Sequence, residues 1–193
     1  MNKNIAVFLF ALCPLIPAAS QFSYGIILSF SLLWLFFTGI LMKKLIVKIA
    51  PANTAPYIEL VGIAGFSTIF FLVLQGFYPV LAVSLGLYIY ISSFSYVLLS
   101  SIASFPPQTQ ASLSIMPFIP ILLGFSLLRE ILGFGTVSVP IPSGSLAFIV
   151  LPDFNSYGLG FWGTAGGALI LLGIFAWFVQ FLNRKKEIIQ RNS

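Results

Sequence analysis

Charged side chains are scarce in this chain of 193 residues: they make up 7% of it, whereas hydrophobic residues make up 59%. A soluble domain carries about 25% charged residues, so this sequence could not cover a water-facing surface. It has no histidine and a single cysteine, which excludes an internal disulfide and a complete cysteine–histidine metal site within one chain. It also lacks serine–histidine–aspartate, zinc and nucleotide-binding motifs, so it offers no complete catalytic constellation.

Long apolar runs take the place of the missing charges. A bilayer accepts apolar surface, and runs of this length indicate helices rather than the short alternating strands of a barrel. The net charge is +5, and most of the positive charge flanks the apolar runs, which favours orientation in a membrane over nucleic-acid binding. We therefore predict an all-α, polytopic membrane helix bundle that is surrounded by lipid and binds no nucleic acid.

The pattern predicts six transmembrane helices in a single domain that comprises residues 1–193. Runs of about 20 apolar residues match the thickness of a bilayer. The predicted spans are residues 5–19, 24–42, 57–76, 80–101, 113–132 and 161–182.

The first run also resembles a secretory signal peptide, because Lys3 precedes an apolar stretch that ends at Ala18-Ala19. Leu12 and Pro17 are poor residues near a cleavage site, however. We therefore expect the run to be retained as the first span, interrupted at Pro14, because proline removes a backbone donor from a helix.

Positive charge predicts the orientation. With six spans and a cytoplasmic N-terminus, eight of the nine basic residues lie in the cytoplasm and only Arg129 lies outside. We thus predict that both termini lie in the cytoplasm, and the family resemblance given below implies the bacterial cytoplasmic (inner) membrane. Two inverted halves of three helices follow, and such repeats often carry interrupted helices. The expected interruptions are Cys13-Pro14 in the first helix and the polar patch Ser92–Tyr96 in the fourth.

Cys13 sits beside the proline that breaks the first apolar run. A thiolate at such a break is suited to a soft metal or an iron–sulfur cluster. A free cysteine is also a small apolar side chain that packs in cores. The residues alone leave both interpretations open.

The stretch Arg129-Glu130-Ile131-Leu132-Gly133-Phe134-Gly135-Thr136 closes the predicted fifth span. Two adjacent charges are costly in lipid, so they must lie at the membrane surface or be paired inside protein. Gly133 and Gly135 suit a helix stop with a sharp exit. Two interpretations therefore stay open. In one, the pair reaches the membrane surface beside a helix cap; in the other, it belongs to a functional site.

Three stretches carry a family resemblance: Leu12-Cys13-Pro14-Leu15, Tyr78-Pro79 with Ser84-Leu85-Gly86, and Arg129–Gly133 with Gly135-Thr136. They resemble the six-span subunits shared by the Rnf electron transport complex and the sodium-pumping NADH:quinone reductase. The chain is most similar to the E subunit of Rnf and the D subunit of the sodium pump. Matching spacing extends from about Leu9 to Leu182.

The resemblance implies a membrane subunit that pairs with a homologous six-span subunit of inverse topology, alongside the other subunits of such a complex. Cysteines from the interrupted first and fourth spans of both subunits would hold an iron–sulfur cluster. Electrons would cross the membrane there, coupled to Na⁺ or H⁺ movement. On this basis Cys13 is a candidate ligand of the metal cluster, and Pro14 belongs to the structural motif with Arg129, Glu130, Gly133 and Gly135.

The sequence departs from the family at its second cysteine position, which Tyr96 occupies. A phenol is a hard oxygen donor and a poor replacement for thiolate in a cluster. We therefore expect a subunit of an ion-translocating electron transport complex with an altered redox centre. The alternatives are the membrane component of a small-molecule, vitamin-type transporter and a scaffold without chemistry.

Overall fold

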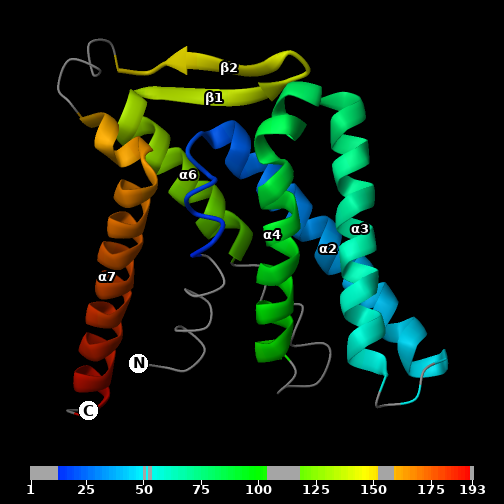
Figure 1. The fold of residues 1–193 in the computed structure, drawn as a ribbon. Coiled ribbons are helices and arrows are strands. Elements are labelled where there is room, and N and C mark those ends of the chain that lie inside the picture. Colours follow the sequence, from blue (N-terminus) through cyan, green and yellow to red (C-terminus); the bar gives the residue numbers. More distant parts are fainter. Residues whose placement is uncertain (1–12, 50, 52–53, 104–117, 152–158, 192–193) are drawn as a thin grey trace.

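The computed structural model describes residues 13–49, 51, 54–103, 118–151 and 159–191, which are mostly helical (Figure 1). The helices are α2 (Phe22–Ile49), α3 (Ala55–Phe77), α4 (Pro79–Ala103), α6 (Phe118–Phe134), the 3₁₀ helix η2 (Leu159–Gly163) and α7 (Ala165–Arg191). Helix α2 contacts α3, α4 and α6, so it is the central element of the bundle.

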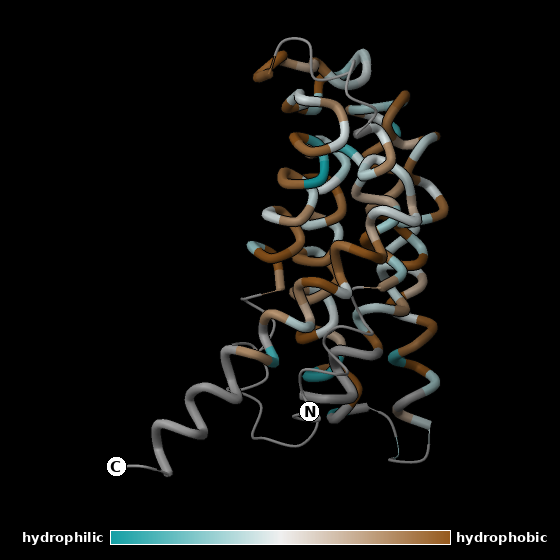
Figure 2. The backbone as a smooth tube through the Cα atoms, turned by 90° about the vertical axis from the view of Figure 1, so that its left-hand side faces the viewer, coloured by the Kyte–Doolittle hydropathy of each residue, from teal (hydrophilic) through white to brown (hydrophobic). Residues whose placement is uncertain are grey.

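Three helices are long and apolar enough to cross a bilayer, at Phe22–Ile46, Tyr57–Phe77 and Pro79–Val97. They correspond to the second, third and fourth predicted spans, and Tyr78 separates the last two. Hydrophobic residues dominate the backbone tube, and strongly hydrophilic residues occupy only short stretches of it (Figure 2). The length and composition of these helices agree with the prediction of a membrane protein.

The other three predicted spans are tested only in part, and residues 118–132 of the fifth span belong to α6, as predicted. Residues 5–12 of the first span lie outside the described residues, and residues 13–18 form turns rather than helix. Residues 113–117 of the fifth span also lie outside the described residues. In the sixth span the first residues belong to η2, and the apolar part of α7 covers only Ala165–Phe178. The number of six spans and the inverted halves remain predictions.

Helix α4 is continuous from Pro79 to Ala103, so the predicted interruption at Ser92–Tyr96 is wrong. A serine hydroxyl in a helix can bond to a carbonyl of the preceding turn. Ser92 Oγ lies 2.6 Å from the Ile89 carbonyl oxygen and 3.0 Å from Ser31 Oγ on α2. The polar patch therefore joins two helices where we expected a break.

Residues between the fifth and sixth predicted spans form a β-hairpin, so the described part of the chain is mostly helical rather than all-α. Strand β1 (Thr136–Ile141) pairs antiparallel with β2 (Gly144–Ile149), and Thr136 lies opposite Ile149. Pro140 is tolerated because a two-stranded sheet has only edge strands. The hairpin lies across one end of the helices (Figure 1), and β1 contacts both α2 and α6.

The main core surrounds the N-terminal half of α2. It includes Leu28, Leu85 and Phe118, none of which is more than 1% exposed. The turn of residues 13–18 adds Leu15 and Ile16 to the same core. This turn is thus packed inside the bundle although it is not helical.

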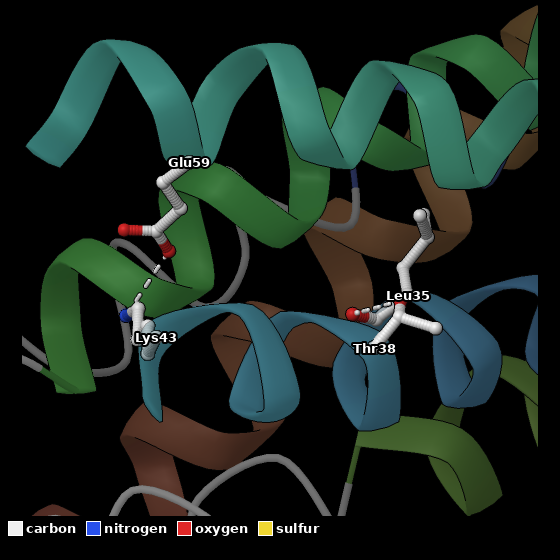
Figure 3. A network of polar contacts seen from close by, with 4 residues as sticks. All are labelled: Leu35, Thr38, Lys43 and Glu59. Carbon is white, nitrogen blue, oxygen red and sulfur yellow. Dashed lines mark hydrogen bonds and ion pairs between the residues drawn. The ribbon is translucent and has the colours of Figure 1, made fainter. Parts of the chain in front are cut away.

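The opposite end of the bundle carries the basic residues. The C-terminal ends of α2 and α7 both lie away from the hairpin (Figure 1). There Lys43 Nζ on α2 lies 3.3 Å from Glu59 Oε1 on α3, close enough for attraction but without hydrogen-bond geometry (Figure 3). One turn earlier, Thr38 Oγ1 donates to the Leu35 carbonyl at 3.2 Å. Partly exposed pairs such as Lys43–Glu59 contribute about 0–1 kcal/mol to stability.

Candidate functional site

Arg129 and Glu130 lie inside the protein. Both belong to α6, and each is only 1% exposed. The interpretation of a pair that reaches toward the membrane surface is therefore wrong. Two buried charges are stable only where hydrogen bonds replace their water shell, so the partners of these side chains define the site.

The Arg129 guanidinium donates hydrogen bonds to five backbone carbonyls in two distant segments. Nη1 reaches the carbonyls of Ile16 at 2.6 Å and Pro17 at 3.1 Å in the turn of residues 13–18. The remaining donors reach the segment around η2. The partners there are the carbonyls of Trp162 (3.1 Å), Gly163 (2.8 Å) and Thr164 (2.9 Å).

A guanidinium is suited to this task because it holds five N–H donors in a rigid plane. The turn of residues 13–18 and η2 are not α-helical, so their carbonyls do not form the regular hydrogen bonds of an α-helix. The carbonyls of Ile16 and Thr164 also accept from the amides of Ala19 and Ala168, and Arg129 adds a donor to all five. It thereby fixes the position of the N-terminal turn against the start of α7.

Glu130 binds the first residue of α2 and the hairpin. Its Oε2 accepts hydrogen bonds from the Phe22 amide and, at 2.9 Å, from Ser138 Oγ on β1. Its Oε1 accepts one from Thr136 Oγ1 at 3.1 Å. The first amides of a helix have no partner within the helix, and the helix dipole favours an anion beside them. Glu130 thus acts as a cap of α2 from a remote position in the sequence.

Ser138 extends this cap. Its hydroxyl lies 3.2 Å from the Ser23 amide and 3.1 Å from Ser23 Oγ, and both serines are fully or almost fully buried. Two successive amides of the first turn of α2 are therefore satisfied by side chains of α6 and β1. Sequence reasoning missed both serines, because nothing in their local sequence distinguishes them from other serines.

The two glycines of the motif are required for backbone reasons. A Cβ on Gly133 would lie 2.8 Å from the Gly163 backbone nitrogen, so only glycine allows α6 and η2 to approach this closely. Gly135 has a φ of 66°, in the left-handed region that glycine adopts without strain. It ends α6 immediately before β1, so the predicted helix stop is confirmed.

Cys13 lies at the start of the turn that Arg129 holds. It is a free thiol of intermediate exposure, followed by Pro14. Arg129 contacts the same turn three and four residues later, at Ile16 and Pro17. The structure thus brings the Cys13-Pro14 turn and the Arg129 motif into one site.

Tyr96 lies elsewhere. It is 4% exposed and packs with Leu35 and Ile63 in a small cluster that is separate from the main core containing the turn. A Cβ on Gly39 would be 2.0 Å from the Tyr96 hydroxyl, so this hydroxyl rests against the backbone of α2. The Tyr96 ring therefore fills a contact between α2, α3 and α4.

These residues do not fit a four-thiolate cluster within this chain. Cys13 is its single thiol, and the Tyr96 oxygen is packed against Gly39. Among the described residues there is no group of three or more histidine, cysteine, aspartate or glutamate side chains that could hold a metal ion. In the Arg129–Thr136 motif both carboxylate oxygens of Glu130 accept hydrogen bonds from protein groups.

Two comparisons with known proteins bear on the identity of the chain. A protein of Treponema pallidum (strain Nichols), described as an uncharacterized protein, is 30% identical over 162 residues, which cover 84% of this chain and 81% of that protein. A family model described as "Rnf-Nqr subunit, membrane protein" matches residues 1–176. That match includes the Cys13 turn, α4 and the whole Arg129–Thr136 stretch, and the chain therefore belongs to the Rnf-Nqr family of membrane protein subunits.

Proposed function

We propose that this chain is a membrane subunit of an ion-translocating electron transport complex, in which it forms part of the membrane framework. The observation that carries the proposal is the set of hydrogen bonds from Arg129 to backbone carbonyls, which we call the Arg129 clamp. Through these bonds the buried guanidinium holds a non-helical turn inside a helix bundle. That turn begins at Cys13, the single thiol of the chain. A bundle that served only to fill the membrane would gain nothing from so costly an arrangement.

The redox role of the chain is narrower than the resemblance implies. Cys13 is the one thiolate that the chain offers, and a cluster shared with a partner subunit would take its remaining thiolates from other chains. Tyr96 acts as a packing residue in this proposal. The chain's own contribution to electron transfer is thus at most one ligand, and its contribution to the framework of the complex is the larger one.

The proposed partners are a homologous six-span subunit of inverse topology and the other subunits of the complex. Large apolar side chains of β2 and the two residues after it support such contacts, because they are between 41% and 76% exposed at one end of the bundle. They are Leu146, Phe148, Ile149, Val150 and Leu151. The basic ends of α2 and α7, which lie at the opposite end (Figure 1), support a cytoplasmic position for that end.

The vitamin-transporter alternative receives less support. A cavity of about 290 Å³ lies between α2, α3 and β1, and its lining contains no charged or amide side chain. Water-soluble vitamins carry several polar groups, and burial of such groups without partners is costly. The family to which the chain belongs also favours the electron transport complex.

The test is purification of the tagged chain from its native membrane in mild detergent. We expect a homologous membrane subunit and flavin-bearing subunits to copurify, with flavin measured by fluorescence and iron by mass spectrometry. Lys44→Ala, at an exposed position, serves as a control that leaves the complex intact. Purification of the chain without any flavin- or iron-bearing subunit would refute the proposal.

The same preparation tests the redox centre. If Cys13 is a ligand, Cys13→Ser lowers the iron content per complex, while Tyr96→Phe leaves the iron content unchanged. An unchanged iron content in Cys13→Ser would remove Cys13 from the ligands and leave the chain as framework alone.

A further inference from the structure

We infer that the apolar cavity between α2, α3 and β1 is a binding site for one acyl chain of a membrane phospholipid. The inference is independent of the proposed electron transport function. The floor of the cavity is formed by Ile27, Phe70 and Leu74, which are 5–8% exposed. Its rim is formed by Phe30, Val73 and Phe77, which are 51–69% exposed. The cavity is therefore a hollow in the flank of two membrane-spanning helices.

The cavity's size and chemistry suit a hydrocarbon chain. Its volume of about 290 Å³ gives room for about ten groups of the size of a water molecule. A cavity lined only by apolar side chains stays dry and takes apolar ligands. The hydroxyl of Tyr78 is the one polar side-chain group on its lining, so polar ligands would lose hydrogen bonds to water without replacement.

The position of the cavity identifies the lipid bilayer as the source of the ligand. The rim is continuous with exposed apolar residues of α3 such as Ile69 and Leu72, which are 47% and 59% exposed. The surrounding membrane covers this flank of the protein, because Tyr57–Phe77 is a candidate membrane span. A lipid chain reaches the hollow without crossing water.

One end of the cavity lies beside the hairpin, at Tyr78 and Pro140. Tyrosine is enriched where a membrane meets water, since its ring is apolar and its hydroxyl is polar. The lipid head group is thus placed near Tyr78, beyond the cavity. Because no charged side chain lines the site, the acyl chain is bound without preference for the head group.

The test uses the full chain in liposomes that contain a phosphatidylcholine with a diazirine on one acyl chain. After illumination, mass spectrometry locates the covalently attached lipid. We expect attachment at the cavity residues to exceed that at other exposed apolar residues of α3 by at least fivefold. Replacement of the labelled phosphatidylcholine by labelled phosphatidylglycerol leaves the ratio unchanged.

Two neighbouring variants of α3 provide the matched control. Val73→Trp fills the mouth of the cavity and lowers its labelling at least fivefold, whereas Leu72→Trp, at an exposed position outside the lining, keeps it within twofold. Ile26→Phe fills the cavity from α2 and serves if Val73→Trp does not fold.

Three results would overturn the inference. Even labelling along the exposed face of α3 would indicate ordinary surrounding lipid. Displacement of the label by an added isoprenoid quinone would assign the site to an isoprenoid chain. Cross-linking of the cavity residues to a copurifying subunit would assign it to a protein contact.

Discussion

The Arg129 guanidinium lies 2.6 Å from the carbonyl oxygen of Ile16, a residue 113 positions earlier in the chain. This bond and its neighbour to Pro17 connect α6 to the N-terminal turn. The adjacent Glu130 meanwhile binds α2 and the hairpin. Two consecutive residues therefore hold four segments together: the turn, α2, the hairpin and η2.

Loss of the guanidinium should strongly destabilise the protein. Arg129→Met removes all five of these hydrogen bonds, and only the carbonyls of Ile16 and Thr164 have a second donor among those described, the amides of Ala19 and Ala168, so we expect a loss of at least about 3 kcal/mol in the free energy of unfolding. Arg129→Lys should lie between this variant and the wild type, because an ammonium offers three donors from one point and cannot span both segments. Thermal unfolding in detergent, followed by tryptophan fluorescence, measures the effect. Lys44→Ala controls for the loss of a cation. Equal melting temperatures for Lys44→Ala and Arg129→Met would contradict the claim that the hydrogen bonds of Arg129 stabilise the protein.

The Glu130 carboxylate should contribute through its charge at the start of α2. Glu130→Gln keeps the size of the side chain but removes the anion from the helix N-terminus, which should cost about 1–2 kcal/mol. Glu59→Gln is the matched control, since its partly exposed pair with Lys43 contributes about 0–1 kcal/mol. The same unfolding experiment applies to both. A larger loss in Glu59→Gln than in Glu130→Gln would mean that Glu130 is no cap.

Two glycines of α6 should respond differently to the same substitution. Gly133→Ala places a methyl group 2.8 Å from the Gly163 nitrogen, whereas Gly124→Ala meets no atom within 4 Å. We expect Gly133→Ala to destabilise the protein by roughly 2 kcal/mol or more, through overpacking against backbone. Gly124→Ala should be neutral or stabilising by up to about 1 kcal/mol, because alanine favours helix. Melting temperatures of the two variants decide the matter, and a reversed order would show that η2 does not pack on α6 as described.

Membrane topology can be tested with single cysteines in a Cys13→Ser background. Lys48→Cys lies near the end of α2, and Ser143→Cys lies between the strands of the hairpin; both positions are exposed. We expect a membrane-impermeant maleimide to label Ser143→Cys in intact cells, and to label Lys48→Cys only after the membrane is opened. The basis is the positive charge at the α2 end. Labelling of both positions from the same side would contradict the proposed orientation.

Hydropathy predicted the part of the fold that depends on composition alone. The helices around Leu28, Phe70 and Leu85 were found because uninterrupted apolar runs have few structural alternatives in a bilayer. The polar patch at Ser92 misled the prediction, because a serine hydroxyl can bond within its own helix and leave that helix intact. Hydropathy does not distinguish a helix that is broken at a polar patch from one that stays intact because its serine bonds within the helix.

The hairpin was missed although its local signal is present. Val137 and Val139 alternate with smaller residues, and Pro142-Ser143 before Gly144 is a turn sequence between two apolar segments. Apolar runs of this length are too short for a membrane span and predict only a connector, whereas their period-two pattern indicates strands.

The partners of Arg129 could not have been predicted from residue types. The motif was recognised as a place where charges must be satisfied, but its five acceptors are backbone carbonyls, which every residue carries. Only the tertiary structure shows that Ile16 and Gly163 present theirs to one side chain. The Cys13 turn and the Arg129 motif were thus predicted separately, and their contact is a finding of the structure.

Cys13 provides the most direct measurement, because it is the single thiol of the chain and lies in the turn that Arg129 holds. The rate of its reaction with a maleimide is measured in wild type, Arg129→Met and the control Lys44→Ala, all in detergent below their melting temperatures. Arg129→Met should react at least fivefold faster than wild type, because the turn is released, and Lys44→Ala should react at the wild-type rate. An equal rate in Arg129→Met and wild type would contradict the claim that Arg129 fixes the position of the thiol.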